Sequence, residues 1–382
     1  MTIISRVEVF PVAPRWVFVR IETDDGLVGW GEASLEGHAE IICAAVEQLA
    51  NYLVGKNPFS IEDHWQVLTK GQFYRGGAVL ASAVSGVDQA LWDLLGKSLN
   101  APVHQLLGGA VREKIRAYGW VGGDDPAEVA EHVARQMEAG LTAVKMNASG
   151  KIGKNATLNE INQVVERAEK VRAVLGPDRD FAIDFHGRFS LPTARRIASQ
   201  LEEFHPLFIE EPVVPENTHI IGRVVEATAI PIATGERLYS RQEFLPALQA
   251  GVTVVQPDVA HAGGISEMRR IGTLADTFDA LLAPHCPLGP LALASCLQVG
   301  FATPNFLIQE QSIGIHYNNG AEVLDYVSDT SPLEFVEGNF QILTGPGLGI
   351  TIDEKAVRKA ASEWSGWKNP IWRHNDGSFA EW

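Results

Sequence analysis

Three acidic residues recur at equal intervals in the middle of the chain. They are Asp184 in "FAIDFHGR", Glu210 in "PLFIEEPV" and Glu236 in "IATGERLYSR", and each acid lies 26 positions after the one before it. This interval fits one strand-and-helix unit, so the three carboxylates would lie at one mouth of a barrel, where catalytic groups of such folds gather. Oxygen ligands from separate elements suit Mg²⁺ better than soft metals. We therefore predict one Mg²⁺ per subunit, held by these acids.

A purely structural explanation exists for each acid taken singly. Each carboxylate would then cap the following helix or pair with an arginine such as Arg188 or Arg237. Three acids in register favour the metal site. Glu211 follows Glu210 directly and must point the other way if the segment is extended. We assign Glu210 as the ligand and keep Glu211 as the alternative.

A histidine with a carboxylate partner is predicted on the next two units. Asp258 in "VVQPDVAHAGG" and His285 in "LLAPHCPLGP" are 27 residues apart. A carboxylate one unit earlier holds the imidazole in one tautomer and raises its basicity, as proton abstraction requires. The alternative is a hydrogen-bonded structural histidine beside Pro284. His261 lies near in sequence, and we give it no role.

Two further residues complete the predicted site. His186 lies two residues after Asp184, so both side chains face the same way on an extended segment. It could act as a general acid toward a leaving hydroxyl, as a fourth ligand, or as a hydrogen-bonding spectator, and the sequence leaves these open. A carboxyl group at Glu310, in "FLIQEQSIG", could stabilise an enediolate oxygen opposite the metal.

These residues need elements that bring them together. Residues 4–34 alternate between apolar and polar side chains on either side of Asp24-Asp25-Gly26, which predicts a small antiparallel sheet with a hairpin turn. Helical patterns follow at 37–54, 59–69 and 78–100. We predict an α+β domain over residues 1–113.

From residue 114 the pattern changes to short apolar strands separated by helix-length segments. Eight such strands predict a parallel β/α barrel over residues 114–317. Residues 318–382 lose the alternation and are expected to return to the N-terminal domain. The predicted strands are Ile115–Val121, Ala143–Asn147, Phe181–Phe185, Leu207–Glu210, Ile230–Thr234, Val252–Gln256, Ala280–Pro284 and Asn305–Gln309.

Composition narrows the class of protein. The chain has 382 residues and a formal net charge of -16, which repels nucleic-acid phosphates and anionic lipids. We expect neither a nucleic-acid nor a membrane partner. No apolar run approaches the roughly 20 residues of a membrane span. The start "MTIISRVEVFPV" fits a first strand rather than a signal peptide, so we expect a cytoplasmic location.

These motifs together resemble the enolase superfamily, and the Asp258 and His285 pair resembles the dyad of its mandelate racemase group. The resemblance implies a capping domain, completed by the C-terminal segment, on a modified (β/α)7β barrel of the TIM type. It also implies abstraction of a proton next to a carboxylate. Similarity to the D-galactonate dehydratase family is nearly continuous, through "RWVFVRIETDDGLVGWGE", "FYRGG", "DFHGR", "GERLYSR", "APHCPLGP", "QEQSIGIHYN" and "NPIWRH".

The resemblance implies a hydro-lyase that converts D-galactonate to 2-dehydro-3-deoxy-D-galactonate. His285 would take the C2 proton, Mg²⁺ and Glu310 would stabilise the enediolate, and His186 would assist loss of the 3-hydroxyl. Superfamily racemases typically carry Lys-x-Lys on the second barrel strand, but this chain reads Lys145-Met146-Asn147. Asn147 cannot act as an opposing base, so racemisation is disfavoured. Lys145 and Asn147 are instead expected to contact the substrate.

Loops of the capping domain are expected to recognise the distal hydroxyls. The candidates are Arg15, Trp16, Tyr74 and Arg75. Because such loops would read the stereochemistry at C4 and C5, another aldonic acid is an alternative substrate. Folding needs alone would also account for the glycines and aromatic residues of these loops. A non-catalytic binding protein on the same fold is the alternative from another class. We expect a homo-oligomer, whose subunit number the sequence does not give.

Overall fold

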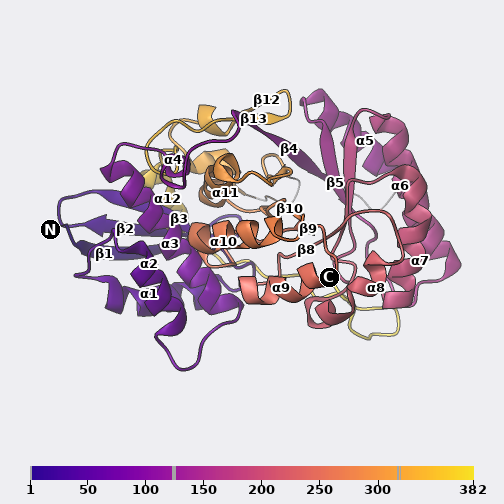
Figure 1. Ribbon diagram of the computed structural model, residues 1–382, viewed down its shortest axis with the longest axis horizontal. Helices are drawn as coiled ribbons and strands as arrows, with labels where there is room; N and C mark the ends of the chain where they lie inside the picture. Colours follow the sequence, from indigo (N-terminus) through magenta and orange to yellow (C-terminus); the bar gives the residue numbers. More distant parts are fainter. Residues whose placement is uncertain (1, 123–125, 316–317, 319) are drawn as a thin grey trace.

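The computed structural model describes residues 2–122, 126–315, 318 and 320–382. A small antiparallel sheet with its helices forms one side of the molecule, and a barrel of parallel strands with outer helices forms the other (Figure 1). The predicted fold class, a modified (β/α)7β barrel with an α+β N-terminal domain, is therefore confirmed. The predicted domain boundary at 113 stays a prediction, and the boundary at 317 falls outside the described residues.

The N-terminal sheet has its strands in the order β1-β2-β3, all antiparallel. The predicted turn lies between β2 and β3, where Gly26 has φ 85°, a region that favours glycine. The predicted helices differ from the observed ones by at most two residues at their ends. The elements are β1 (Ile4–Val12), β2 (Trp16–Thr23), β3 (Val28–Glu32), α1 (Ala39–Leu53), α2 (Ile61–Lys70), α3 (Ala78–Ser98) and α4 (Val103–Leu106).

Helix α3 is the central helix of this domain, and two glycines of β3 let it approach the sheet closely. A Cβ atom at Gly29 would lie 2.3 Å from Ala90 O, and one at Gly31 would lie 2.1 Å from Gly86 O. Within the described residues, α3 is the one helix long and apolar enough to cross a membrane, but 67% of its most apolar window is buried inside the protein. Its apolar character therefore serves the core.

The barrel follows as seven strand-and-helix pairs and a last strand. Parallel pairing joins β4 through β10 in chain order, and β11 pairs with β4. The bridge between Leu282 and Phe306 closes the circle. The strands are β4 (Lys114–Val121), β5 (Ala143–Asn147), β6 (Asp180–Asp184), β7 (Ile209–Glu210), β8 (Ile232–Thr234), β9 (Val254–Val255), β10 (Leu281–Leu282) and β11 (Gln309–Glu310).

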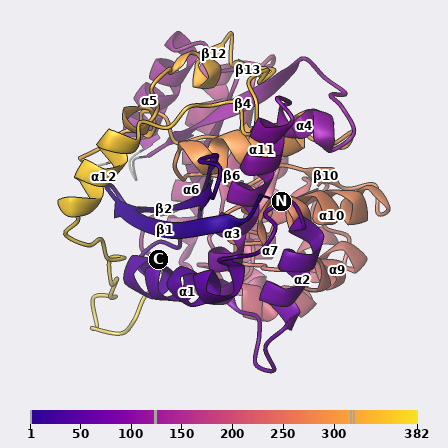
Figure 2. The ribbon, with the colours of Figure 1, turned by 90° about the vertical axis from the view of Figure 1, so that its left-hand side faces the viewer.

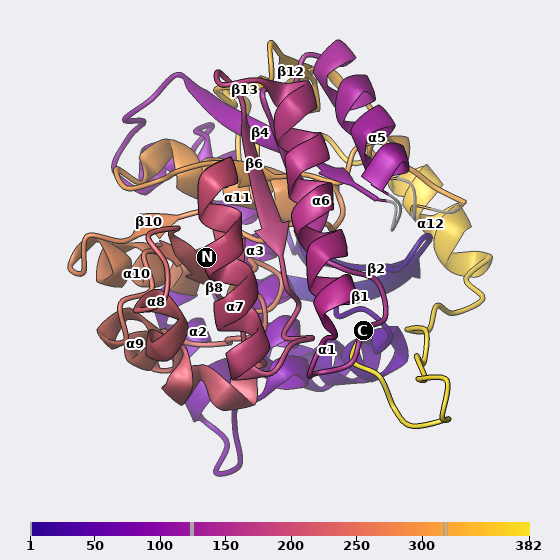
Figure 3. The same ribbon diagram turned by 90° about the vertical axis from the view of Figure 1, so that its right-hand side faces the viewer.

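The barrel helices cover the outside of these strands, as α5, α6 and α7 show in Figure 3. Helix α6 begins with a capping box, in which Thr157 and Glu160 bond each other's backbone N–H groups. The helices are α5 (Pro126–Glu138), α6 (Leu158–Leu175), α7 (Leu191–Leu201), α8 (Gly222–Val225), α9 (Arg241–Gln249), α10 (Gly264–Asp276) and α11 (Pro290–Ala302).

Several barrel strands are shorter than the sequence predicted. The strand expected at 252–256 is observed only at Val254–Val255, and the one expected at 280–284 only at Leu281–Leu282. Single hydrogen bonds still extend these ladders, such as Ala283 N–H to Val255 O at 3.0 Å. The apolar run therefore marks the whole buried segment, whereas the regular ladder covers only its middle.

The C-terminal segment contacts both domains. Strands β12 (Phe335–Val336) and β13 (Asn339–Gln341) extend the barrel sheet, with β13 antiparallel to β4. The sequence did not predict this pairing. Helix α12 (Glu354–Ser362) packs on β1, as expected, and lies beside the N-terminal sheet in Figure 2. The final residues then run to the barrel, where Trp372 lies under the Arg188 guanidinium at 4.9 Å.

Candidate active site

An apolar layer of side chains lies inside the barrel, and each strand or a residue flanking it contributes one side chain to this layer. Because side chains alternate along a strand, the residue two positions further on also faces inward, one layer nearer the mouth. That step leads from the interior layer to five predicted site residues: Lys145, Asp184, Glu210, His285 and Glu310. The interior layer is Tyr118, Ala143, Ala182, Phe208, Ala233, Val254, Ala283 and Ile308.

The predicted metal ligands come together at this mouth. Asp184 and Glu210 are at most 1% exposed and lie on neighbouring strands in register. One ligand atom each from Asp184, Glu236 and His186 lies within 4.8 Å of the others. Glu236 also reaches the dyad, with Oε2 3.3 Å from His285 Nε2.

Lys145 binds between the acids. Its Nζ lies 2.9 and 2.8 Å from the two carboxylate oxygens of Glu210, 2.9 Å from Glu310 Oε1, and 4.0 Å from Asp184 Oδ2. Burial lowers the pKa of Lys145, but Glu210 and then Glu310 outweigh it, so the pKa lies well above its usual value. The sequence missed this ion-pair role.

The buried carboxylates of Asp184 and Glu210 have the oxygen atoms and the negative charge that a hard cation such as Mg²⁺ prefers. Burial raises the pKa of Glu210, and the nearby Asp184 raises it further. Burial also raises the pKa of Asp184, but His186 and Lys145 outweigh it and hold that pKa below its usual range. Asp184 Oδ2 is buried, with His186 Nε2 at 2.9 Å and Lys145 Nζ at 4.0 Å. An oxygen of this kind, among crowded carboxylates, fits a divalent cation.

Glu211, the alternative ligand, points elsewhere. Its carboxylate accepts two hydrogen bonds from Arg237, at 2.9 Å from Nε and 2.5 Å from a terminal nitrogen. The same Arg237 nitrogen donates to the backbone oxygen of His186 at 3.3 Å. Glu211 has φ 42° and His186 has φ 48°, so both have left-handed backbones at the mouth. The geometry favours Glu210 over Glu211 as the ligand.

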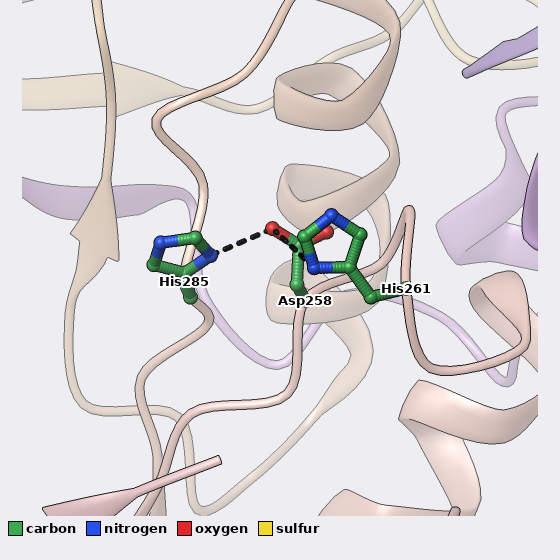
Figure 4. Close-up of side chains that lie close together, drawn as sticks. All are labelled: Asp258, His261 and His285. Atoms are coloured by element: carbon green, nitrogen blue, oxygen red, sulfur yellow. Dashed lines mark hydrogen bonds and ion pairs between the residues drawn. The ribbon is translucent and has the colours of Figure 1, made fainter. Parts of the chain in front are cut away.

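Asp258 and His285 form the predicted pair. Asp258 Oδ2 lies 2.7 Å from His285 Nδ1, and Asp258 is fully buried (Figure 4). Burial lowers the pKa of His285, but Glu236, Glu310 and Asp258 together hold it well above its usual value. His261 is on the other side of the carboxylate, with Nδ1 3.8 Å from the same oxygen.

His186 lies next to Asp184. Its Nε2 is 2.9 Å from Asp184 Oδ2, and its backbone N–H donates to Asp184 Oδ1 at 2.8 Å. The His186 side chain is 24% exposed, more than that of His285, so it is accessible from the mouth. This position is compatible with both an acid and a ligand.

Glu310 stands on the opposite side of Lys145 from Glu210. One of its oxygens binds the ammonium, and the other accepts the backbone N–H of Cys286 at 2.8 Å. Glu310 thus connects the last strand to the loop that carries His285.

The predicted substrate contacts divide into three groups. Arg15 is 2% exposed and binds Glu36, Asn318 Oδ1 and Pro287 O, and Trp16 is fully buried. Asn147 is at the mouth, and its Oδ1 is buried without a hydrogen bond among the described residues.

Tyr74 and Arg75 lie apart from the acids. Tyr74 is 85% exposed, on the loop between α2 and α3. Both residues line a cavity of about 690 Å³ together with Tyr239 and Gly263, and none of the predicted metal ligands lines it. Their proposed contact with substrate stays a prediction.

Both domains of the chain match known protein families. Residues 128–356 match the family described as enolase C-terminal domain-like, and residues 12–108 match the N-terminal domain of mandelate racemase and muconate lactonizing enzyme. The chain is 49% identical over 380 residues to D-galactonate dehydratase of Cronobacter sakazakii, covering 99% of this chain and 100% of that protein.

Solved structures show the same architecture. An enolase from Agrobacterium radiobacter, provisionally described as a galactarate dehydratase and bound to sodium and L-malate, is 34% identical with a TM-score of 0.91, covering 99% of this chain and 100% of that one. A mandelate racemase/muconate lactonizing enzyme from Jannaschia is 31% identical with a TM-score of 0.87, covering 96% and 98%. With both domains matched and the acids and dyad at one barrel mouth, the chain belongs to the enolase superfamily.

Proposed function

We propose that this protein is a hydro-lyase that converts D-galactonate to 2-dehydro-3-deoxy-D-galactonate and water. The observation that carries the proposal is the His285 imidazole, held by Asp258 at 2.7 Å and facing the acids at the same barrel mouth. The full-length similarity to a D-galactonate dehydratase supports the choice of substrate.

His285 is the base in this proposal. Its Nδ1 faces Asp258, so Nε2 is the nitrogen that takes the C2 proton. The buried Asp258 carboxylate fixes this tautomer and stabilises the imidazolium that forms. General base catalysis of this kind contributes about 10²- to 10⁴-fold.

Asp184, Glu210 and Glu236 would hold a divalent metal, for which we propose Mg²⁺. When bound, the metal would stabilise the negative charge that develops on the substrate carboxylate. Glu310 and Lys145 flank the same space. The Lys145 ammonium supplies a positive charge, and Glu310 lies opposite Glu210, 2.9 Å from that ammonium.

His186 is the proposed acid. Its partly exposed ring lies beside Asp184, where it can donate a proton to the departing 3-hydroxyl. The resulting enol tautomerises to the 2-keto product. The C2–H bond breaks to His285, and the C3–O bond breaks as the hydroxyl takes the His186 proton and leaves as water. A proton returns to C3 on tautomerisation, so no oxidant is needed.

The test is a screen of aldonic acids with the purified protein and Mg²⁺, detecting 2-keto-3-deoxy acids. D-galactonate should give the highest kcat/KM. A higher value for a C4 or C5 epimer would change the substrate, and no product from any acid sugar would favour a binding protein. A cytoplasmic homo-oligomer remains a prediction from the sequence.

A further inference from the structure

Side chains of the barrel domain form hydrogen bonds to the backbone of residues 286–289, the loop that follows His285. The Cys286 N–H donates to Glu310 at 2.8 Å, and the Ser312 hydroxyl donates to Leu288 O at 2.7 Å. Two backbone groups after the base, at residues 286 and 288, are therefore hydrogen-bonded to the end of strand β11 and the residues that follow it.

Two side chains of the capping domain also form hydrogen bonds to the backbone of this loop. Arg15 donates to Pro287 O at 2.7 Å, and Glu32 accepts the Gly289 N–H at 2.9 Å. Every residue from 286 to 289 thus has a backbone group bound by a distant side chain. Residues from the first 32 positions control the conformation of a loop more than 250 residues later.

Glu32 is the more buried of these two anchors. It ends strand β3 and is fully buried, and its carboxylate also accepts the Ala292 N–H at 2.9 Å and the Ser34 hydroxyl at 2.7 Å. Gly289 is the N-cap residue of α11 and has no side-chain cap of its own. A carboxylate at a helix N-terminus satisfies free N–H groups and the helix dipole. The cap of this barrel helix is therefore supplied by another domain.

We propose that Glu32 is a positioning residue for the catalytic base, which it holds in place through the Gly289 end of the loop. The inference rests on the proposed function only for the identity of the base. Only three residues lie between His285 and Gly289, so release of Gly289 lets the imidazole shift relative to the substrate. A misplacement of about 1 Å costs about 10²-fold in rate.

The contact leaves no room for a side chain on Gly289. A Cβ atom there would lie 2.8 and 2.9 Å from the two carboxylate oxygens of Glu32. Gly289→Ala should therefore push the Glu32 carboxylate away and weaken the same hydrogen bond, now by a change on the Gly289 side.

A matched control exists one unit earlier. Asp88 of α3 is 2% exposed and accepts the Ser266 N–H at 3.0 Å and the Ser266 hydroxyl at 2.6 Å, in the first turn of α10. This is also a buried carboxylate of the capping domain at a barrel helix N-terminus. It does not touch the 285–289 loop, so Asp88→Asn removes a comparable charge without releasing the base.

The experiment compares Glu32→Gln, Gly289→Ala and Asp88→Asn. Because the amide accepts fewer of the three hydrogen bonds, Glu32→Gln should lower kcat by about 10- to 100-fold with KM within about 3-fold. Gly289→Ala should give the same pattern, and the double variant should lose much less than the product of the two factors, since one contact is removed twice. Asp88→Asn should keep kcat within about 2-fold, whatever its effect on Tm.

A second readout does not depend on activity. Amide hydrogen exchange of the peptide 285–293 should accelerate in Glu32→Gln and Gly289→Ala and remain as in the unsubstituted protein in Asp88→Asn. Unchanged exchange, or equal loss of kcat in Asp88→Asn, would overturn the positioning role. If the unsubstituted protein dehydrates no acid sugar, the proposed function fails, while the exchange result still decides whether Glu32 holds the loop.

Discussion

His285 Nδ1 lies 2.7 Å from Asp258 Oδ2, so one ring nitrogen of the histidine is committed to a buried carboxylate. Burial lowers the pKa of His285, but Glu236, Glu310 and this carboxylate favour the protonated ring and together raise that pKa. The carboxylate also leaves Nε2 as the nitrogen directed away from Asp258. The first prediction tests this pairing.

Asp258→Asn should lower kcat by about 10²- to 10⁴-fold, since the imidazole loses its orienting anion. The base must be neutral to act, so the acidic limb of kcat/KM lies at the pKa of the histidine. Without the anion, this pKa falls and the limb should move to lower pH. A pH profile of kcat/KM checks this. His261→Asn is the control, because His261 is also near Asp258 but lies 3.8 Å from its carboxylate, against 2.7 Å for His285. An unchanged limb would contradict the pair.

Removal of metal should abolish turnover, and Mg²⁺ should restore it. Glu210→Gln should lose most activity and metal affinity, because Glu210 faces Asp184 and Lys145. Glu211→Gln should mainly lower Tm, because its carboxylate binds Arg237. Calorimetric titration with Mg²⁺ measures the affinities. Full affinity in Glu210→Gln with loss in Glu211→Gln would reverse the assignment.

Lys145→Met should destabilise the protein by about 3–5 kcal/mol without metal, because it leaves buried carboxylates unpaired. Its Nζ lies within 2.9 Å of both Glu210 and Glu310. A bound cation would restore part of the balance, so Mg²⁺ should raise the Tm of the variant more than that of the unsubstituted protein. Thermal unfolding with and without Mg²⁺ measures both. An equal rise in Tm with Mg²⁺ in both proteins would show that Lys145 does not neutralise the acids.

The two histidines should separate in an exchange experiment. His285→Asn should stop both dehydration and exchange of the C2 hydrogen with deuterated solvent, because no enediolate forms. His186→Asn should allow exchange without product, provided that the enediolate is reprotonated before the substrate leaves. NMR of recovered galactonate gives the answer. Deuterium at C2 with the His285 variant, and none with a metal-loaded His186 variant, would make His186 the base.

Asp88 should make stability depend on pH. Burial raises its pKa from 3.8 to about 7 against the hydrogen bonds from Ser266. Between these two values the folded state holds a proton that the unfolded state has lost, so stability should fall as pH rises and level off above about 7. The contribution is about 1 kcal/mol per pH unit. Unfolding at pH 5, 6, 7 and 8 should show a weaker fall in Asp88→Asn. If the free energy of unfolding fell equally with pH in both proteins, the raised pKa of Asp88 would be contradicted.

The sequence predicted the site best where a repeated unit governs position. Intervals of 26 residues placed Asp184, Glu210 and Glu236 on successive units, and an interval of 27 did the same for Asp258 and His285. The structure brings these residues to one mouth. The spacing works because each parallel strand enters at the same end of the barrel and side chains alternate along it.

Contacts between distant segments left no comparable signal. Lys145 was expected only as a substrate contact, although it pairs with Glu210, 65 residues away. Glu32 ends an ordinary strand in the sequence, and its partner Gly289 is 257 residues away. The α2–α3 loop carrying Tyr74 has no periodic pattern, so its distance from the acids could not be read from spacing. The first of these contacts depends on which side chains meet inside the barrel, and the contact of Glu32 with Gly289 depends on how the two domains dock.

The left-handed backbones of His186 and Glu211 set a limit on engineering this protein for heat resistance. Each such conformation costs a non-glycine residue about 1–3 kcal/mol, which glycine would largely avoid. A library selected for thermal tolerance alone would therefore favour glycine at position 186 and would remove the proposed acid. At position 211 the lost ion pair with Arg237 would outweigh the relief of backbone strain. Stabilised variants of this fold should be selected for turnover in the same round.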